Sequence, residues 1–349
     1  MNIILVLSLF LGLTLILWLA NVADRQRARG QAESGQVFAA LGYVLLALLY
    51  GGLILFGLLF QLLGLFESSP FVADLDRTYR QMGIEIASYS LLGLGFWLPS
   101  LIGLLLLLRP VRRLAGRLMP RFDPLSSVHA VALSYSTLIA INLLVTIGFG
   151  IGNLSTMVTG GTYNLLPLLW AQDLAAAGMA LVGVGWLSRR NLAGALARLG
   201  IVPPTPLQAV LGLGLGVVLA IVILVVEYLA STVGITAGAD VEKLTEQLLG
   251  PLTRSAAGIL TMGLAAALGE ESVFRGALQP RFGLVYTALL FALLHGTYGL
   301  SFATLLVFVV GLILGLVRQR ANTSTTMILH AVYNMTLGVV AYVGVMQRV

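Results

Sequence analysis

Three short clusters combine ionisable and amide side chains inside otherwise apolar stretches of the sequence. They are Glu270, Glu271 and Arg275, then Phe291 and His295, then His330 and Asn334. Ionisable residues are costly inside a membrane and usually serve a function there. A carboxylate in a medium of low dielectric constant is suited to act as a general base. A histidine and an amide on one helix face can donate hydrogen bonds to a developing oxyanion.

The first cluster offers two glutamates in different settings. Glu271 and Arg275 are four residues apart, so we predict that they share a helix face and form an ion pair. Glu270 lies about 100° around the helix from Glu271, which makes Glu270 the freer carboxylate. We place both at the cytoplasmic end of a span over 255–275, where an acid opposes the helix dipole. That mismatch favours a functional reading over the alternative, in which the two glutamates only end a helix at the interface.

The histidines are expected on two further helices. His295 falls about 16 Å into a span that begins near residue 284. His330 and Asn334 are four residues apart and project from one helix face. Each of these residues could instead be a polar contact between helices. The expected chain direction of these spans nevertheless brings all three clusters into the cytoplasmic half of the membrane.

The composition indicates the solvent in which these helices must lie. The chain has 349 residues, of which 58% are hydrophobic and 10% charged, whereas soluble domains carry about 25% charged residues. We therefore predict an all-α, polytopic transmembrane helical bundle of about ten spans. The expected spans are 2–20, 37–66, 83–108, 128–152, 164–187, 207–231, 255–275, 284–300, 301–317 and 324–346.

The charges between the spans predict the topology. Most of the 20 Lys and Arg residues follow odd-numbered spans, whereas the even loops are neutral or acidic. Because positively charged loops stay in the cytoplasm, we expect an integral, multi-pass cell-membrane protein whose amino terminus lies outside and whose odd loops face the cytoplasm. The net charge of +6 is thus attributed to topology and not to nucleic acid. The absence of cysteine excludes disulfides, thiolate metal sites and cysteine nucleophiles.

The order E-E-x-x-x-R, F-x-x-x-H and H-x-x-x-N resembles the CPBP intramembrane protease family. That family includes the CAAX prenyl endopeptidases and bacteriocin-processing or immunity proteins that are often labelled Abi. The resemblance covers roughly 207–346. We therefore expect a CPBP-like protease domain of about five spans at 207–349. Residues 1–206 would form an amino-terminal transmembrane region, also of about five spans, to which the sequence assigns no role.

The resemblance implies roles for the individual residues. Glu270 and His295 would activate a water molecule for attack on a peptide carbonyl near the cytoplasmic face. His330 and Asn334 resemble the pair that stabilises the oxyanion. Glu271, Arg275 and Phe291 would support them, with Arg275 as the structural partner of Glu271. The alternative is a non-proteolytic immunity factor, adaptor or transporter that uses the same polar cluster for binding.

The expected partners are a peptide or protein substrate and the lipid bilayer, with no nucleic acid; the sequence predicts no oligomeric state. We favour a glutamate base that requires no cofactor, because the chain has no H-E-x-x-H pair. A divalent metal such as zinc, bound by Glu270, His295 and His330, remains an open alternative. Asp173 is a further acid within a predicted span. It would either line a substrate path or pair with a polar group on a neighbouring helix, and we favour the pairing.

Overall fold

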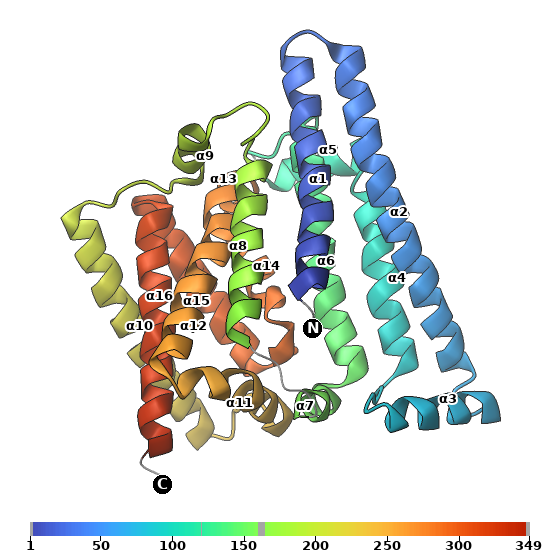
Figure 1. Ribbon diagram of the computed structural model, residues 1–349, viewed down its shortest axis with the longest axis vertical. Helices are drawn as coiled ribbons and strands as arrows, with labels where there is room; N and C mark the ends of the chain where they lie inside the picture. Colours follow the sequence, from blue (N-terminus) through green and yellow to red (C-terminus); the bar gives the residue numbers. More distant parts are fainter. Residues whose placement is uncertain (1–2, 120, 160–164, 347–349) are drawn as a thin grey trace.

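The computed structural model describes residues 3–119, 121–159 and 165–346, which form a bundle of helices (Figure 1). The described part of the chain has no strand beyond a single bridge between Trp186 and Arg190. In chain order the helices of the first half are α1 (Ile3–Ala28), α2 (Ala32–Leu65), α3 (Pro70–Gln81), α4 (Tyr89–Leu105), α5 (Arg109–Leu118), α6 (Ser127–Phe149), α7 (Ile151–Thr159) and α8 (Leu165–Gly183). They are followed by α9 (Leu192–Leu199), α10 (Pro206–Thr232), α11 (Ala239–Thr253), α12 (Ala256–Glu271), the π-helix η1 (Ser272–Leu278), α13 (Gln279–Phe282), α14 (Leu284–Leu294), the 3-10 helix η2 (Gly296–Tyr298), α15 (Phe302–Arg320) and α16 (Thr323–Met346).

The predicted all-α transmembrane architecture is confirmed. Within the described residues, eight helices are long and apolar enough to cross a membrane, namely α1, α2, α6, α8, α10, the α12–η1–α13 run, α15 and α16. Their outward faces carry large exposed hydrophobic side chains, which suit contact with lipid. Each of the ten predicted spans contains a helix, although the third and eighth contain shorter ones. These are α4 with 17 residues, from which α5 bends away by 91°, and α14 with 11.

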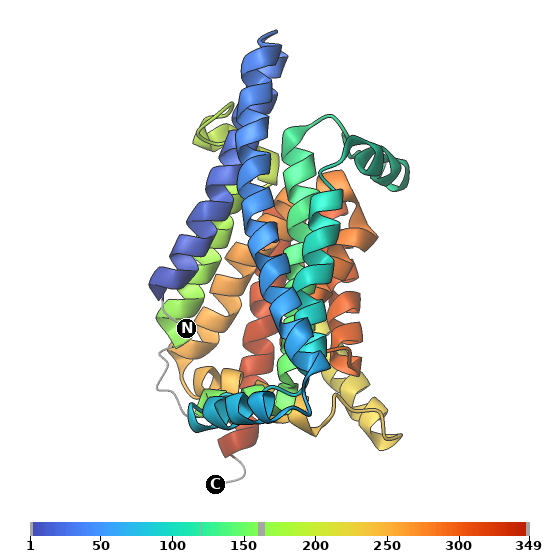
Figure 2. The same cartoon turned by 90° about the vertical axis from the view of Figure 1, so that its right-hand side faces the viewer.

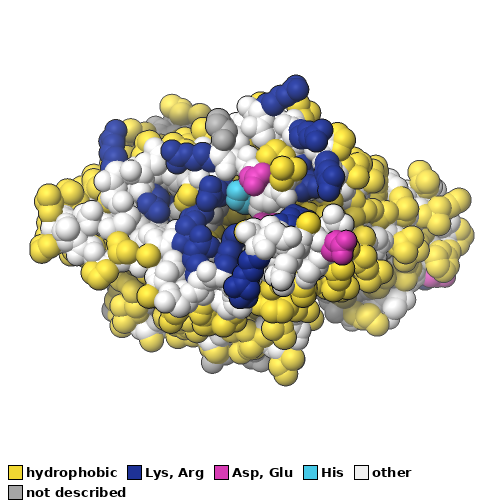
Figure 3. Space-filling view, turned by 90° about the horizontal axis from the view of Figure 1, so that it is seen from above, with side chains coloured by type: hydrophobic (Ala, Val, Ile, Leu, Met, Phe, Trp, Pro, Cys, Tyr) yellow, Lys and Arg dark blue, Asp and Glu magenta, His cyan; other side chains and the backbone are white. Residues whose placement is uncertain are grey.

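Basic side chains gather at one end of the bundle. The α1–α2 connection, α5, α9 and α13 lie at this end, which we call the basic end, whereas α3, α7 and α11 lie at the opposite end (Figures 1 and 2). A view onto the basic end shows many Lys and Arg side chains (Figure 3). The acids of α3 and α11, including Asp74 and Asp240, belong to the opposite end. The folded bundle thus preserves the charge separation seen along the sequence.

Small residues let the carboxy-terminal helices approach closely. A Cβ added at Gly263 of α12 would lie 2.7 Å from the carbonyl oxygen of Ala331 in α16. A Cβ at Gly216 of α10 would lie 2.7 Å from the carbonyl oxygen of Leu329, also in α16. Glycines at such contacts are typical of helix packing in membranes. They hold α16 between α10 and α12, which fixes the positions of His330 and Asn334.

The helix that carries Glu270 continues further than the sequence predicted. The α12 helix passes through η1 into α13, so the run spans Ala256–Phe282 with 27 residues. The prediction that Glu270 lies at the end of its helix is therefore wrong, and the argument from an opposed helix dipole does not apply. Pro280 is the second residue after the end of the π-helix. A wider turn relieves the clash between a proline ring and the carbonyl one turn earlier, so the chain can stay helical past this point.

Candidate active site

The predicted catalytic residues come from three helical segments and lie about 10–18 Å from the basic end. Counting 1.5 Å per residue from the basic end, Glu270 lies about 18 Å deep along α12 and His295 about 16 Å deep along α14. On α16, His330 lies about 10 Å and Asn334 about 16 Å deep. The α14 helix stops at Leu294, so His295 stands where the helix gives way to η2. The short α14 thus brings an imidazole to the middle of the bundle.

Glu271 is the centre of a buried polar network. Its side chain is fully buried, and its Oε1 lies 3.3 Å from Nη1 of Arg275, which is the pairing predicted from their spacing. The same oxygen lies 3.0 Å from Nδ1 of His330. Arg275 also donates a hydrogen bond to the carbonyl oxygen of Gly311, at 3.3 Å. One carboxylate therefore ties η1 and α16 together, and the Gly311 contact adds α15.

Phe291 connects this network to the second histidine. The guanidinium of Arg275 lies 4.2 Å from the centre of the Phe291 ring, a cation–π distance. The same ring lies 5.1 Å from the ring of His295 and 5.9 Å from the ring of His330, between centroids. Both imidazoles therefore flank one buried phenyl group. Phe291 therefore contributes packing to the candidate site. The charged groups beside it are Arg275 and the Glu271 carboxylate that pairs with Arg275.

The hydrogen bonds at Nδ1 determine the tautomer of each histidine. Nδ1 of His295 lies 2.9 Å from the carbonyl oxygen of Phe291. A carbonyl oxygen can only accept, so Nδ1 carries the hydrogen and Nε2 keeps the lone pair when the ring is neutral. Nδ1 of His330 donates to the Glu271 carboxylate in the same way. Each ring thus presents its Nε2 to other groups.

Glu270 is held differently from its neighbour. Its Oε2 is buried and has no hydrogen-bond partner within the described part of the chain. No hydrogen bond or ion pair in that part joins Glu270 to His295 or His330. Glu270 does interact electrostatically with Arg275, Asp173 and Tyr298, and Tyr298 stacks on His295 at 5.9 Å. Oε2 of Glu271 is also buried without a donor, so the difference is that Glu270 forms no ion pair among the described residues. A buried carboxylate oxygen without a donor calls for an explanation.

Asp173 is a second acid at this site, which the sequence reasoning placed in a structural role. It is buried within α8, about 15 Å from Gly183 at the basic end. A Cβ added at Gly269 would lie 2.8 Å from Cα and 2.8 Å from Cβ of Asp173, so the acid sits directly against the residue before Glu270. Asp173 forms no ion pair among the described residues, and its favoured pairing with a polar group on a neighbouring helix stays a prediction. Its position within an apolar span was the signal that could have found it.

Asn334 is anchored to the helix that carries the glutamates. Its Nδ2 donates to the carbonyl oxygen of Met262, at 3.2 Å. Asn334 and His330 share one face of α16, as predicted, because they are four residues apart in one helix. One amide hydrogen is used by Met262, so the second remains available to donate.

The metal alternative finds no support in side-chain placement. Among the residues that the structure describes, no group of three His, Asp or Glu side chains is placed to hold a metal ion. The set Glu270, His295 and His330 therefore does not fit a shared metal site in this structure.

Comparison with known proteins shows that this part of the chain is similar to one protein family. Residues 253–336 match the family model described as type II CAAX prenyl endopeptidase Rce1-like. No curated protein and no solved structure gives a significant match to the chain. The matched segment contains all three polar clusters, and it supports a CAAX-type intramembrane endopeptidase at the level of the family. Residues 253–336 of this membrane protein are thus similar to the Rce1-like type II CAAX prenyl endopeptidases, which is consistent with the resemblance of its motifs to the CPBP family.

Proposed function

We propose that this protein is a glutamate-dependent intramembrane endopeptidase that cleaves a peptide bond toward the basic end of the bundle. The observation that carries the proposal is the contrast between two adjacent carboxylates. Glu271 forms ion pairs with Arg275 and His330 through its Oε1, whereas Glu270 forms no ion pair within the described residues, although Oε2 of each carboxylate is buried without a donor. The first arrangement suits a structural charge, and the second suits a base.

In the proposed reaction, Glu270 removes a proton from a water molecule while Nε2 of His295 accepts the hydrogen bond of the other O–H. The water oxygen forms a bond to the peptide carbonyl carbon, and the electrons of the C=O bond move to the oxygen. The tetrahedral intermediate then collapses, which breaks the C–N bond. The departing amine takes the proton held by Glu270, so that one water is consumed for each bond cleaved.

The oxyanion is the group for which His330 and Asn334 are proposed. Glu271 accepts the hydrogen bond from Nδ1 of His330 and so orients the ring. A protonated ring also carries an Nε2–H, which is the donor proposed for the oxyanion. Asn334 offers the amide hydrogen that Met262 leaves free. Donors placed before the reaction stabilise the developing charge without reorganisation.

The two halves of the chain are proposed to share the site. Residues 207–349 supply the protease helices, and residues 1–206 supply α8, whose Asp173 lies against Gly269. We propose that the basic end faces the cytoplasm, so that substrate reaches the site from that side. No step of this reaction is routed through a metal ion.

The test is cleavage by purified protein in lipid nanodiscs, with prenylated and unprenylated CAAX peptides as probes. Glu270→Gln removes the base and should lower the rate by about 10²–10⁴-fold, whereas the folded fraction should stay unchanged. Activity that survives Glu270→Gln contradicts the mechanism. Activity that is lost in a chelator and restored by zinc contradicts the metal-free form of the proposal. A protein that folds, binds the peptides and cleaves none of them supports the binding function instead.

A further inference from the structure

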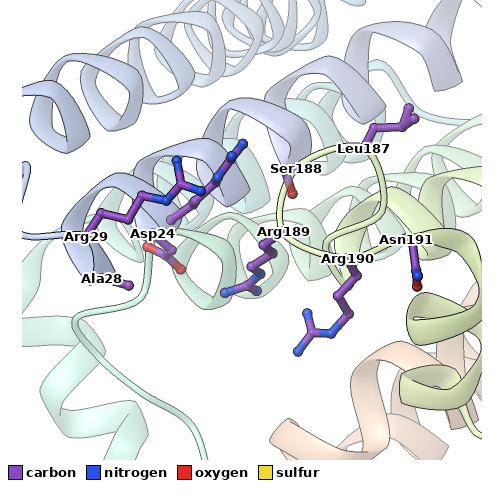
Figure 4. A pocket seen from close by; sticks show the side chains of 9 residues that line it. Asp24, Ala28, Arg29, Leu187, Ser188, Arg189, Arg190 and Asn191 are labelled. Atoms are coloured by element: carbon purple, nitrogen blue, oxygen red, sulfur yellow. The ribbon is translucent and has the colours of Figure 1, made fainter.

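A cavity of about 510 Å³ lies at the basic end, outside the protease domain. It lies between the end of α1 and the turn that connects α8 to α9 (Figure 4). Arginines line it on both sides: Arg25 comes from α1 and Arg29 directly follows that helix, whereas Arg189 and Arg190 come from the turn. Its volume is within the range of about 300–1,000 Å³ that is usual for small-molecule sites. None of these residues has a role in the proposed hydrolysis.

The cavity has more positive charge than its surroundings neutralise. Asp24 is the one carboxylate that lines it, and Asp24 is engaged at the start of α6. It accepts hydrogen bonds from Oγ of Ser126 at 2.6 Å and from the amide of Ser127 at 2.8 Å. It also pairs with Arg27, at 3.5 Å. Within the described residues, none of the four lining arginines forms an ion pair.

The arginines of the turn are also close to one another. Burial lowers the pKa of the Arg189 guanidinium from its ordinary value, and repulsion from Arg190 and Arg281 lowers it further, with only Asp24 acting in the opposite sense. A bound anion would offset this repulsion. Guanidinium groups suit phosphate in particular, because their planar N–H donors match two phosphate oxygens at once.

Hydrogen bonds within the protein fix the conformation of the turn between α8 and α9. Gly185 has a φ of 108°, and its carbonyl oxygen accepts from the amides of Arg189 and Arg190, both at 2.9 Å. Nε1 of Trp18 in α1 donates to the carbonyl oxygen of Leu187 at 3.3 Å, which ties the turn to α1. The guanidinium of Arg190 donates to the carbonyl oxygen of Val184. A site whose backbone is fixed in advance loses less entropy when a ligand binds.

We propose that this cavity binds a phosphate-bearing anion, supplied as the headgroup of an anionic phospholipid in the leaflet at the basic end. The cavity lies where α1 and α8 reach the end of their spans, at the level expected for headgroups. Leu187, which lines it, is 63% exposed and can contact acyl chains. Basic pockets between transmembrane helices on the cytoplasmic side are the sites at which such headgroups bind.

The experiment uses the full-length protein in detergent and needs no peptide substrate. Binding of phosphatidylglycerol and of phosphatidylcholine is measured by native mass spectrometry, and inorganic phosphate serves as the soluble competitor. Two double variants remove charge from the two sides of the cavity, Arg189→Gln with Arg190→Gln, and Arg25→Gln with Arg29→Gln. The matched control is Arg113→Gln with Arg117→Gln, because both are exposed arginines of α5 at the same end.

We expect each cavity variant to weaken phosphatidylglycerol binding by about tenfold or more, and the control to leave it nearly unchanged. Each side of the cavity is tested by its own double variant. If the Arg189 and Arg190 variant misfolds, the Arg25 and Arg29 variant still tests the proposal. Equal losses in the control would overturn the proposal, since diffuse surface charge would then explain the binding. Cavity variants that bind the lipid as well as the parent protein would also overturn it. Binding of inorganic phosphate without a preference for phosphatidylglycerol would overturn the assignment to a lipid headgroup.

Discussion

Nδ1 of His330 lies 3.0 Å from Oε1 of Glu271, although 59 residues separate the two in the chain. The contact joins α16 to the end of α12 and makes Glu271 the shared partner of an imidazole and a guanidinium. It also separates the tasks of two neighbouring glutamates. Glu271 joins the helices, and Glu270 is the glutamate for which we propose the catalytic role.

The adjacent glutamates should therefore respond in opposite ways to the same substitution. Glu271→Gln leaves the buried Arg275 without a compensating charge, so the free energy of unfolding should fall by about 3–5 kcal/mol. Glu270→Gln removes no ion pair and should leave stability nearly unchanged while activity is lost. Unfolding of both variants in mixed micelles measures the first quantity. Equal stability of the two variants would contradict this division of roles.

Phe291 should matter for stability through its contacts with Arg275 and the two imidazoles. It is 2% exposed, so Phe291→Ala should cost about 3–5 kcal/mol of unfolding free energy. Leu289→Ala on the same helix is the control, because Leu289 is 44% exposed at the outer surface. Thermal unfolding of the two variants compares them. A larger loss for Leu289→Ala would show that the packing around Phe291 is not the main support of the site.

Gly269 should tolerate no side chain, because Asp173 occupies the space. Gly269→Ala would place a Cβ 2.8 Å from Cα of Asp173, so α8 and α12 would have to separate at a cost of about 1–3 kcal/mol. Gly214→Ala in α10 is the matched control, since nothing lies within 4 Å of its added Cβ. The fraction of protein that stays folded in detergent and the rate of peptide cleavage should both fall for Gly269→Ala only. Full activity of that variant would argue against close contact between Asp173 and the site.

The orientation of the bundle can be tested directly because the chain contains no cysteine. A single cysteine introduced at Gln31, between α1 and α2, should be protected from an impermeant maleimide applied to intact cells. One introduced at Ser68, between α2 and α3, should react. Both positions are exposed in the structure, so burial does not explain a difference. The reverse labelling pattern would place the basic end outside the cell.

The sequence alone determined the properties that depend on neighbouring residues. Apolar runs of bilayer length predicted a helix in every expected span, because the backbone must satisfy its hydrogen bonds internally in lipid. The spacing of Glu271 and Arg275 predicted their ion pair, since residues four apart meet on any helix. The alternation of charge along the loops also predicted that basic side chains would gather at one end of the bundle, because the charge of each loop can be read directly from its own residues.

Only the tertiary structure decided which helices meet and how each is rotated. The π-helix that carries α12 past Arg275 has no simple sequence signal, so Glu270 was expected at a helix end and lies within the span instead. The contacts of Asp173 with Gly269 and of His330 with Glu271 join segments far apart in the chain. Such contacts depend on the depth and rotation of packed helices. Those are set by the fit of many side chains together, and no single periodic pattern encodes them.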